Sequence, residues 1–229
     1  MENKYQLTIN KFIKMKKVLI ALVALSTILV SCNGEKKEKV VVKEEVKVEK
    51  VAIVNNVDLT TSMMTWKGTK PTGEHNGTVA LKSGGLVVEN GVLKEGEFVI
   101  DMSTIKNLDM AGSAGAGKIE AHLKNADFFD IAVYPTSTFV ITSVLEVEAN
   151  LAVTGNLTIK DVTKSITIPA KISSEDGVTT FTSALFNIDR ADFNVKYGSK
   201  RWIEGLKDKF IDDLVEMSFV VKTTKQLNK

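Results

Sequence analysis

The residues with the most obvious chemical potential are two histidines. His75 and His122 have carboxylates nearby in the sequence, Glu74 and Asp127, but neither pair has the spacing of metal ligands. Serines are present as well, yet none lies in a nucleophile elbow that would point to a Ser-His-Asp hydrolase. Each histidine is therefore expected to have a hydrogen-bonded structural role or to line the mouth of a site, and neither a metal nor a catalytic residue is predicted.

A glycine-rich segment is the second candidate for chemistry. Residues 112–118 read GSAGAGK, which is the glycine and lysine spacing of a phosphate-binding loop. Ile119 stands where that loop needs Ser or Thr to hold magnesium, and the required parallel strand-helix-strand unit is missing. The segment is interpreted as a tight lead-in to a helix over about 118–124, and no cofactor is expected.

The single cysteine indicates an anchor. Cys32 follows Ser31 and an apolar run, 18–30, which is preceded by four lysines and is too short to span a bilayer comfortably. This layout predicts a lipoprotein signal peptide over residues 1–31, with Met1 or Met15 as the start. Cys32 would then be the first mature residue, acylated by a fatty acid such as palmitate. An uncleaved membrane helix is the alternative.

Charge and cysteine content exclude two further classes. The chain has 30 Lys and Arg against 28 Asp and Glu, and residues 1–31 hold five of those lysines and one of those acids, so the remainder carries a net charge of −2. No basic face for nucleic acid is implied. With one cysteine, an intrachain disulfide framework is impossible, so the fold must depend on its core.

The segment that follows the cysteine is low in complexity. Residues 35–50 read EKKEKVVVKEEVKVEK, which is dense in both charges and free of aromatic residues. Such a segment buries too little apolar surface to offset its ordering entropy, so residues 32–50 are predicted to be a solvated tether. The alternation of Val with Lys and Glu leaves an edge strand or a short helix as the alternative.

Residues 51–229 have the composition of one globular domain, and most of its segments alternate with a period of two. In one such segment Phe139, Ile141, Leu145 and Val147 share a parity. Eight to ten strands in an antiparallel meander close more readily into a barrel than they remain an open sheet. The turn signals between them are Ser83-Gly84-Gly85, Asn90-Gly91, Ala149-Asn150, Lys160-Asp161 and Asp176-Gly177.

Four segments together resemble the YceI-like lipid and polyisoprenoid-binding proteins, and the likeness covers about residues 57–222. They are WKGTKPTGEHNGTV (66–79), KIEAHLKNADFFDIAVYPTSTF (118–139), VTGNLTIKDVTKSITIPAKI (153–172) and NIDRADFNV (187–195). The most specific match has His122-Leu123, Asp127-Phe128-Phe129-Asp130 and Tyr134-Pro135 followed by Phe139, because order and spacing agree.

The resemblance implies a lipocalin-like antiparallel β-barrel of about eight strands, with one short helix and a covering loop, that holds an isoprenoid or other long-chain lipid in its lumen. The residues expected to line the lumen are Phe98, Ile100, Phe139, Ile141, Val153, Leu157, Ile168, Phe186, Met217 and Phe219. The residues expected at the mouth or lid are His122, Phe128, Phe129 and Tyr134. The alternatives are that the lumen residues fill the barrel as an ordinary core, and that the loop aromatics only pack beneath their loop.

Polar residues outside the lumen are given structural roles. Arg190 and Asp192 are expected to form a local ion pair, and Lys207 to Lys209 together with Asp212-Asp213 a solvated turn before the last strand. Taken together, the sequence predicts a non-enzymatic lipoprotein of a bacterial cell envelope, anchored to a membrane and facing the periplasm or the cell surface. The alternatives are an envelope interaction module with a filled barrel or sandwich and, less favoured, an enzyme on a hydrophobic substrate. The oligomeric state stays open, with a homodimer as one option.

Overall fold

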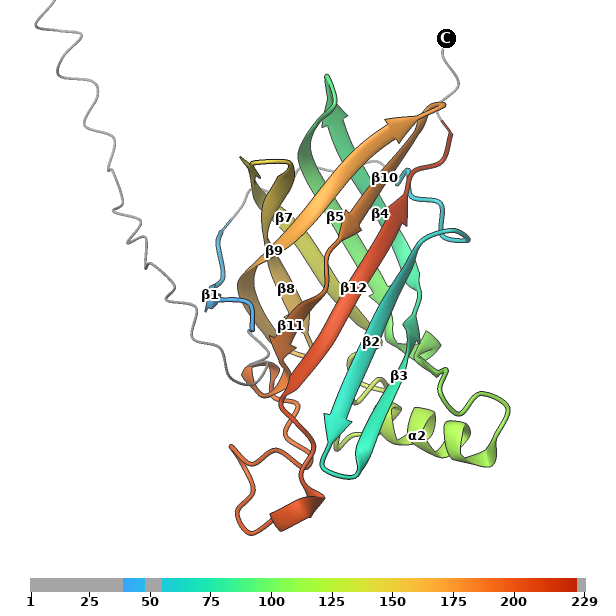
Figure 1. Ribbon diagram of the computed structural model, residues 1–229, viewed down its shortest axis with the longest axis vertical. Helices are drawn as coiled ribbons and strands as arrows, with labels where there is room; N and C mark the ends of the chain where they lie inside the picture. Colours follow the sequence, from blue (N-terminus) through green and yellow to red (C-terminus); the bar gives the residue numbers. More distant parts are fainter. Residues whose placement is uncertain (1–38, 48–54, 226–229) are drawn as a thin grey trace, which may run out of the picture. The chain divides into compact units, whose positions relative to one another are not determined.

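The computed structural model describes residues 39–47 and 55–225, in which twelve strands form one antiparallel sheet (Figure 1). The strands are β1 (Val42–Glu44), β2 (Met63–Lys70), β3 (Gly73–Val79), β4 (Leu81–Glu89), β5 (Val92–Asp101), β6 (Lys106–Asn107), β7 (Thr136–Val147), β8 (Asn150–Ile159), β9 (Val162–Glu175), β10 (Val178–Ser183), β11 (Phe186–Asp189) and β12 (Leu214–Lys222). The helices are α2 (Ala114–Lys124) and three 3-10 turns, η1 (Met102–Thr104), η2 (Arg190–Phe193) and η3 (Lys207–Lys209).

The order of the strands shows how the sheet curls. It runs from β4 through β5, β7, β8, β9, β10, β12 and β2 to β3, with β6 beyond β3. Its first and last long strands, β4 and β3, are joined through the single residue Ala80, so the end of β3 lies next to the start of β4 and the sheet must curl. The prediction of an all-β antiparallel fold with one α-helix is confirmed. The apolar faces of the strands turn inward and form one continuous core.

Most of the predicted turns lie between strands. Asn90, Lys160 and Asp176 occupy hairpin turns with φ of 53°, 56° and 49°, the left-handed region that such two-residue turns require. The turn predicted at Ser83-Gly84-Gly85 is wrong, because these residues lie inside β4. Glycine at position 84 allows the ring of Phe98 to lie close to the backbone of β4, because a Cβ on Gly84 would lie 2.9 Å from Cδ1 of Phe98.

The parity predicted along β7 holds only for its first half. The register against β8 shifts between Ile141 and Ser143, which is the mark of a β-bulge. Beyond the bulge the inward and outward faces exchange, so Leu145 and Val147 are 63% and 51% exposed, whereas Val144 packs against the core. The extra residue reverses the alternation without leaving a signal in the apolar pattern.

The helix begins four residues earlier than predicted. Ser113 caps its N-terminus, where the serine side chain accepts a hydrogen bond from the backbone N–H of Ala116. The glycines of the GSAGAGK segment therefore lie at the helix start and inside its first turns. Only Gly112 and Ser113 of this segment lead into the helix, so the predicted lead-in is shorter than expected.

Part of the predicted tether is folded. Residues 42–44 form β1, which pairs with the β9 segment 164–166, so over these residues the edge-strand alternative is the one observed. The backbone N–H of Val40 also donates to the carbonyl of Asn187 beside β11 at 2.8 Å, so the segment bridges β9 and β11. Backbone hydrogen bonds to β9 and to Asn187 offset the entropy lost when this segment becomes ordered. Its charge-rich side chains alone would not offset that loss. The predicted signal peptide and Cys32 lie outside the described residues.

Asn156 on β8 holds the far end of this segment. Its amide Nδ2 donates to the carbonyl of Val46 at 2.6 Å, and its Oδ1 accepts from the N–H of Val46 at 3.0 Å. The substitution Asn156→Ala is expected to release this end, so that the backbone amides of 39–47 exchange with solvent at least about tenfold faster in hydrogen-exchange mass spectrometry. Thr154→Ala, on the same strand, is the control and should leave that exchange unchanged. Equal protection of these amides in Asn156→Ala and wild type would show that β1 does not depend on the hydrogen bonds of Asn156.

Candidate ligand-binding site

The curled sheet encloses an apolar cavity of about 280 Å³. This volume approaches the roughly 300–1,000 Å³ of typical small-molecule sites. The polar and partly exposed wall residues Gly68, Thr69, Lys70, His75, Ile119, His122, Ile211 and Asp212 gather on the end of β2, the start of β3, α2 and the residues before β12. The mouth of the cavity is therefore at this end.

Phenylalanines close the other end of the cavity. Phe98 and Phe219 line it and are buried, and Phe181 packs behind both, with ring centroids 6.0 Å from Phe98 and 5.0 Å from Phe219. Phe186 adds an edge contact to Phe219 at 6.4 Å. The cavity is thus a blind pocket with an aromatic floor, shaped to receive a ligand end first.

Eight of the ten residues predicted to line the lumen border this cavity: Phe98, Ile100, Phe139, Leu157, Ile168, Phe186, Met217 and Phe219. Ile141 and Val153 do not. Both belong to the packed core, and Val153 has no exposed surface at all. Alternation identifies the inward face of a strand, but it cannot tell at which level that face is filled by neighbouring side chains.

Glycine makes room for one wall of the cavity. The ring of Phe139 lies across Gly155 on the neighbouring strand, where an added Cβ would come within 2.4 Å of Cζ. The close approach of ring and backbone requires glycine at this position. The VTGNLTI motif therefore has a packing role at the site.

Three of the four predicted mouth residues border the cavity, namely His122, Phe128 and Phe129. His122 makes edge-on contacts with Phe128 at 5.8 Å and with Tyr197 at 4.4 Å between ring centroids. Tyr134 does not border the cavity, and its ring lies instead beneath Nζ of Lys160, 5.8 Å away. The aromatic loop therefore both packs on itself and forms part of the wall.

Sequence reasoning missed several other wall residues. Trp66 and Met64 on β2 line the cavity and share a parity, so the alternation of this strand could have found them. The polar wall residues Lys70, Asp212 and Arg190 come from separate parts of the chain, and no local pattern signals their convergence.

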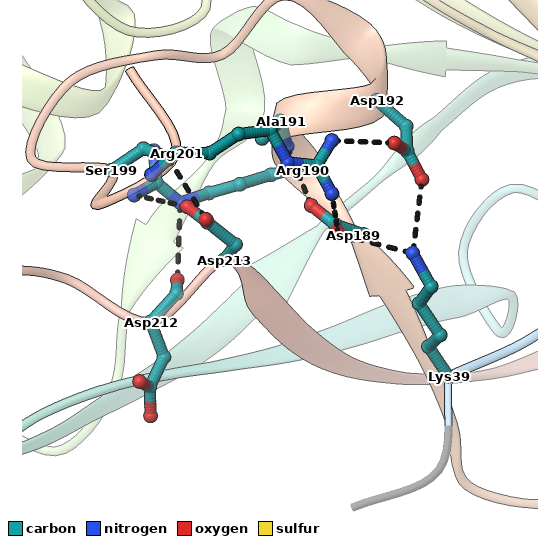
Figure 2. Close-up of polar contacts among 9 residues, drawn as sticks. All are labelled: Lys39, Asp189, Arg190, Ala191, Asp192, Ser199, Arg201, Asp212 and Asp213. Carbon is teal, nitrogen blue, oxygen red and sulfur yellow. Dashed lines mark hydrogen bonds and ion pairs between the residues drawn. The ribbon is translucent and has the colours of Figure 1, made fainter. Parts of the chain in front are cut away.

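Arg190 is the most buried charge near the mouth, with a side chain only 2% exposed. Its guanidinium donates to three backbone carbonyls: Nε to Asp212 at 3.1 Å, Nη1 to Val195 at 2.9 Å and Nη2 to Ile211 at 3.0 Å. Nη2 is also 3.2 Å from Oδ1 of Asp213, an ion pair without hydrogen-bond alignment (Figure 2). Burial lowers the pKa of Arg190, against the opposing effect of the neighbouring aspartates. The arginine thus ties η2 to the residues that precede β12.

The predicted ion pair between Arg190 and Asp192 is wrong. Asp192 binds Arg201 and Lys39, and the same two cations also bind Asp189 (Figure 2). The predicted solvated turn is correct for Lys207–Lys209, which form the exposed turn η3, but wrong for Asp212-Asp213, because both aspartates are half-buried. Asp212 accepts from Oγ1 of Thr69 at 2.6 Å, and Asp213 from Oγ of Ser199 at 2.9 Å. Local sequence spacing cannot reveal these long-range partners.

His75 is held at the mouth by Asp109. Nδ1 of His75 lies 2.8 Å from Oδ2 of Asp109, whose Oδ1 accepts from the N–H of Asn76 and from the side-chain amide of Asn107. Desolvation opposes ionisation of this carboxyl, but the three hydrogen bonds and the nearby histidine outweigh it and lower the pKa of Asp109 to about 2. The cluster fixes the outer end of β3 against the loop that follows β6.

This low pKa makes part of the stability pH-dependent. Because the folded pKa of about 2 lies below the unperturbed 3.8, ionised Asp109 stabilises the fold above about pH 4, and that contribution is lost as the pH falls toward 2. Asp109→Asn is expected to cost about 1 kcal/mol at neutral pH, reduced from the full shift by solvent screening. The difference in melting temperature between variant and wild type should shrink between pH 4 and pH 2. Asp127→Asn beside His122 is the matched control and should cost less. A difference in melting temperature that stays constant with pH would contradict the lowered pKa of Asp109.

The chemistry of the cavity is that of a binding site for apolar groups. Its walls are almost wholly hydrocarbon and aromatic, with charged and polar groups only near the mouth. Across residues 39–47 and 55–225, no group of three His, Cys, Asp or Glu side chains has the arrangement of a metal site. Within the same ranges, no helix has the length and hydropathy needed to cross a bilayer.

A family model for the YceI-like domain matches residues 55–223, nearly the whole described domain. The chain belongs to the YceI-like family. The match begins after β1, so the strand contributed by residues 42–44 lies outside the family domain.

Curated relatives align over parts of this domain. Protein YceI of Escherichia coli O157:H7 is 38% identical over 82 residues, which are 34% of this chain and 43% of the relative. Protein YceI of Salmonella arizonae is 41% identical over 56 residues, 24% of this chain and 29% of the relative. The chain thus spans less than half the length of these YceI relatives.

Two solved structures share the fold. BcnA of Burkholderia cenocepacia is 24% identical with a TM-score of 0.60, and the alignment covers 74% of this chain and all of that one. A polyisoprenoid binding domain from Saccharophagus degradans, implicated in plant cell wall breakdown, is 18% identical with a TM-score of 0.58, over 76% of this chain and all of that one. At these identities the likeness concerns the fold alone.

Proposed function

We propose that this YceI-like protein binds a long-chain lipid, an isoprenoid or a similar amphiphile, with its hydrocarbon part in the cavity and its polar end at the mouth. The observation that carries the proposal is the blind apolar pocket with an aromatic floor and polar groups only near its opening. The Saccharophagus degradans domain, described as polyisoprenoid binding, supports the ligand class by its shared fold.

The energetics of such a site favour a chain-like ligand. Each methylene that leaves water for the pocket contributes roughly 0.8 kcal/mol, so a few isoprene units supply useful affinity with hardly any polar contacts. Selectivity between chains that differ by one methylene is modest, about 1–3 kcal/mol. The polar groups at the mouth, Lys70, His75, His122 and Asp212, are placed to contact a head group.

We further propose a carrier, storage or sequestering role without catalysis. The family and the apolar walls support this role, because the titratable groups of the cavity lie near the mouth and not along its depth. The proposed setting is a bacterial envelope membrane, where acylated Cys32 would anchor the protein facing the periplasm or the cell surface. Its support is the lipoprotein-like run before Cys32.

The test is to purify the full-length protein from native membranes, extract it with organic solvent and analyse the extract by untargeted mass spectrometry. A long-chain lipid at a stoichiometry approaching one per protein is expected. An unrelated lipoprotein prepared in the same detergent controls for carried-over membrane lipid. Recovery of no lipid above that control would reject the proposal and favour an interaction module instead.

A further inference from the structure

The loop between η2 and β12 exposes large apolar side chains. Tyr197, Trp202 and Ile203 are 42%, 49% and 41% exposed, although residues of these types usually pack inside a fold. All three lie within residues 196–210, which we call the basic loop. Figure 1 shows the orange-red chain of this region extending beyond the ends of β2 and β3.

The basic loop differs in charge from the rest of the domain. It contains five basic residues and two acidic ones, whereas the chain after residue 31 carries a net charge of −2. Nζ of Lys196 lies 4.0 Å from the ring centroid of Trp202, and Nζ of Lys200 lies 3.3 Å from that of Phe210. Cations next to exposed tryptophan and aliphatic side chains are typical of segments that bind the interface of an anionic bilayer.

The basic loop lies at the mouth of the cavity. Ile211, directly after it, lines the cavity, and its N–H donates to the carbonyl of Gly198 at 2.9 Å. α2, which also borders the mouth, lies at the same end of the sheet (Figure 1). The N-terminal segment joins the domain here too, because Lys39 shares the carboxylates of Asp189 and Asp192 with Arg201 (Figure 2).

We propose that the basic loop docks on the surface of an anionic lipid bilayer and sets the mouth of the cavity against it. The four lysines of the loop face the phosphate groups, while Trp202 and Ile203 enter the interface between headgroups and acyl chains. The proposal rests on the proposed lipid binding, since a mouth against the membrane allows a lipid to enter the cavity without crossing water. Cys32 is seven positions before Lys39, so the chain between them can extend at most about 25 Å. An acyl anchor on Cys32 would therefore keep the mouth of the cavity near the membrane.

The experiment places the full-length acylated protein in vesicles and measures the fluorescence of Trp202. The chain has two tryptophans, so the difference between wild type and Trp202→Phe isolates this one. In vesicles with 30% phosphatidylglycerol, brominated acyl chains are expected to quench the Trp202 signal. Quenching should fall at least about threefold in pure phosphatidylcholine, in high salt and in the double variant Lys207→Gln/Lys209→Gln. Leu145→Ser/Val147→Ser, exposed at the opposite end of β7, is the control and should quench like wild type.

Quenching that is absent from both the anionic and the phosphatidylcholine vesicles, or equal in both, would overturn the docking proposal. The exposed side chains of the basic loop would then favour contact with a protein partner. Lipid recovery from the same preparations separates this proposal from the function on which it rests. Lipid recovered without quenching would reject docking alone, whereas quenching without recovered lipid would support docking and reject the cavity as a lipid site.

Discussion

Replacing Leu157 with Trp is expected to remove lipid from the purified protein, lowering its recovery at least about tenfold. Leu157 is buried in the wall of the cavity and pairs across the sheet with Phe139. The indole would occupy space that the ligand needs, in a cavity of about 280 Å³. Because this space is otherwise open, the overpacking penalty of about 1–3 kcal/mol seen in filled cores should be largely avoided.

The matched control is Thr158→Trp on the next residue of β8, whose side chain lies on the opposite face of the strand. It introduces the same indole and should leave lipid recovery unchanged. Melting temperatures of both variants, measured without lipid, show whether the fold is intact. Wild-type recovery from a folded Leu157→Trp protein would place the ligand somewhere else.

Replacing Arg190 with Met is expected to produce the largest loss of stability, about 3–5 kcal/mol. The substitution keeps an apolar side chain of similar reach, but it leaves the carbonyls of Val195, Ile211 and Asp212 without their donor. It also leaves the half-buried Asp213 without its cation. For a domain of this size the melting temperature should fall by roughly 10 °C, readable by calorimetry or circular dichroism.

Arg201→Met is the matched control for Arg190→Met. Arg201 is far more exposed, at 41%, and Lys39 still pairs with Asp189 and Asp192 when Arg201 is removed, so its loss should cost clearly less than that of Arg190. Arg190→Lys keeps the charge but cannot reproduce the planar fork, and its stability should lie between those of wild type and Arg190→Met. A melting temperature for Arg190→Met close to that of Arg201→Met would show that the three carbonyls find other donors.

The sequence carried enough information for the fold class because alternation and turns are local. Hairpin turns such as Asn90-Gly91 and Asp176-Gly177 have residues suited to left-handed geometry, so the antiparallel connections could be predicted. The bulge after Ile141 could not, since one extra residue reverses the faces of a strand without changing its composition. For the same reason Leu145 and Val147 lie on the opposite face from Phe139 and Ile141, against the predicted parity.

The candidate site was predictable in its apolar part and not in its polar part. Inward parity identified wall residues such as Phe139 and Leu157, while Ile141 and Val153 show that parity does not reveal which levels are filled. The partners of Arg190 come from 195 and 211–213, and those of Asp192 include Lys39 from a segment predicted to be a tether. Such contacts depend on the path of the chain in three dimensions, which local patterns do not determine.

The most direct test of lipid binding in the cavity is the dependence of affinity on chain length. Trp66 lines the cavity, and in Trp202→Phe it is the only tryptophan, so its fluorescence reports ligand entry. Titrating delipidated protein with linear alcohols of increasing length should show affinity rising about two- to fourfold for each added methylene and levelling off once the pocket is full. An affinity that does not change with chain length, or no response from Trp66, would contradict the account.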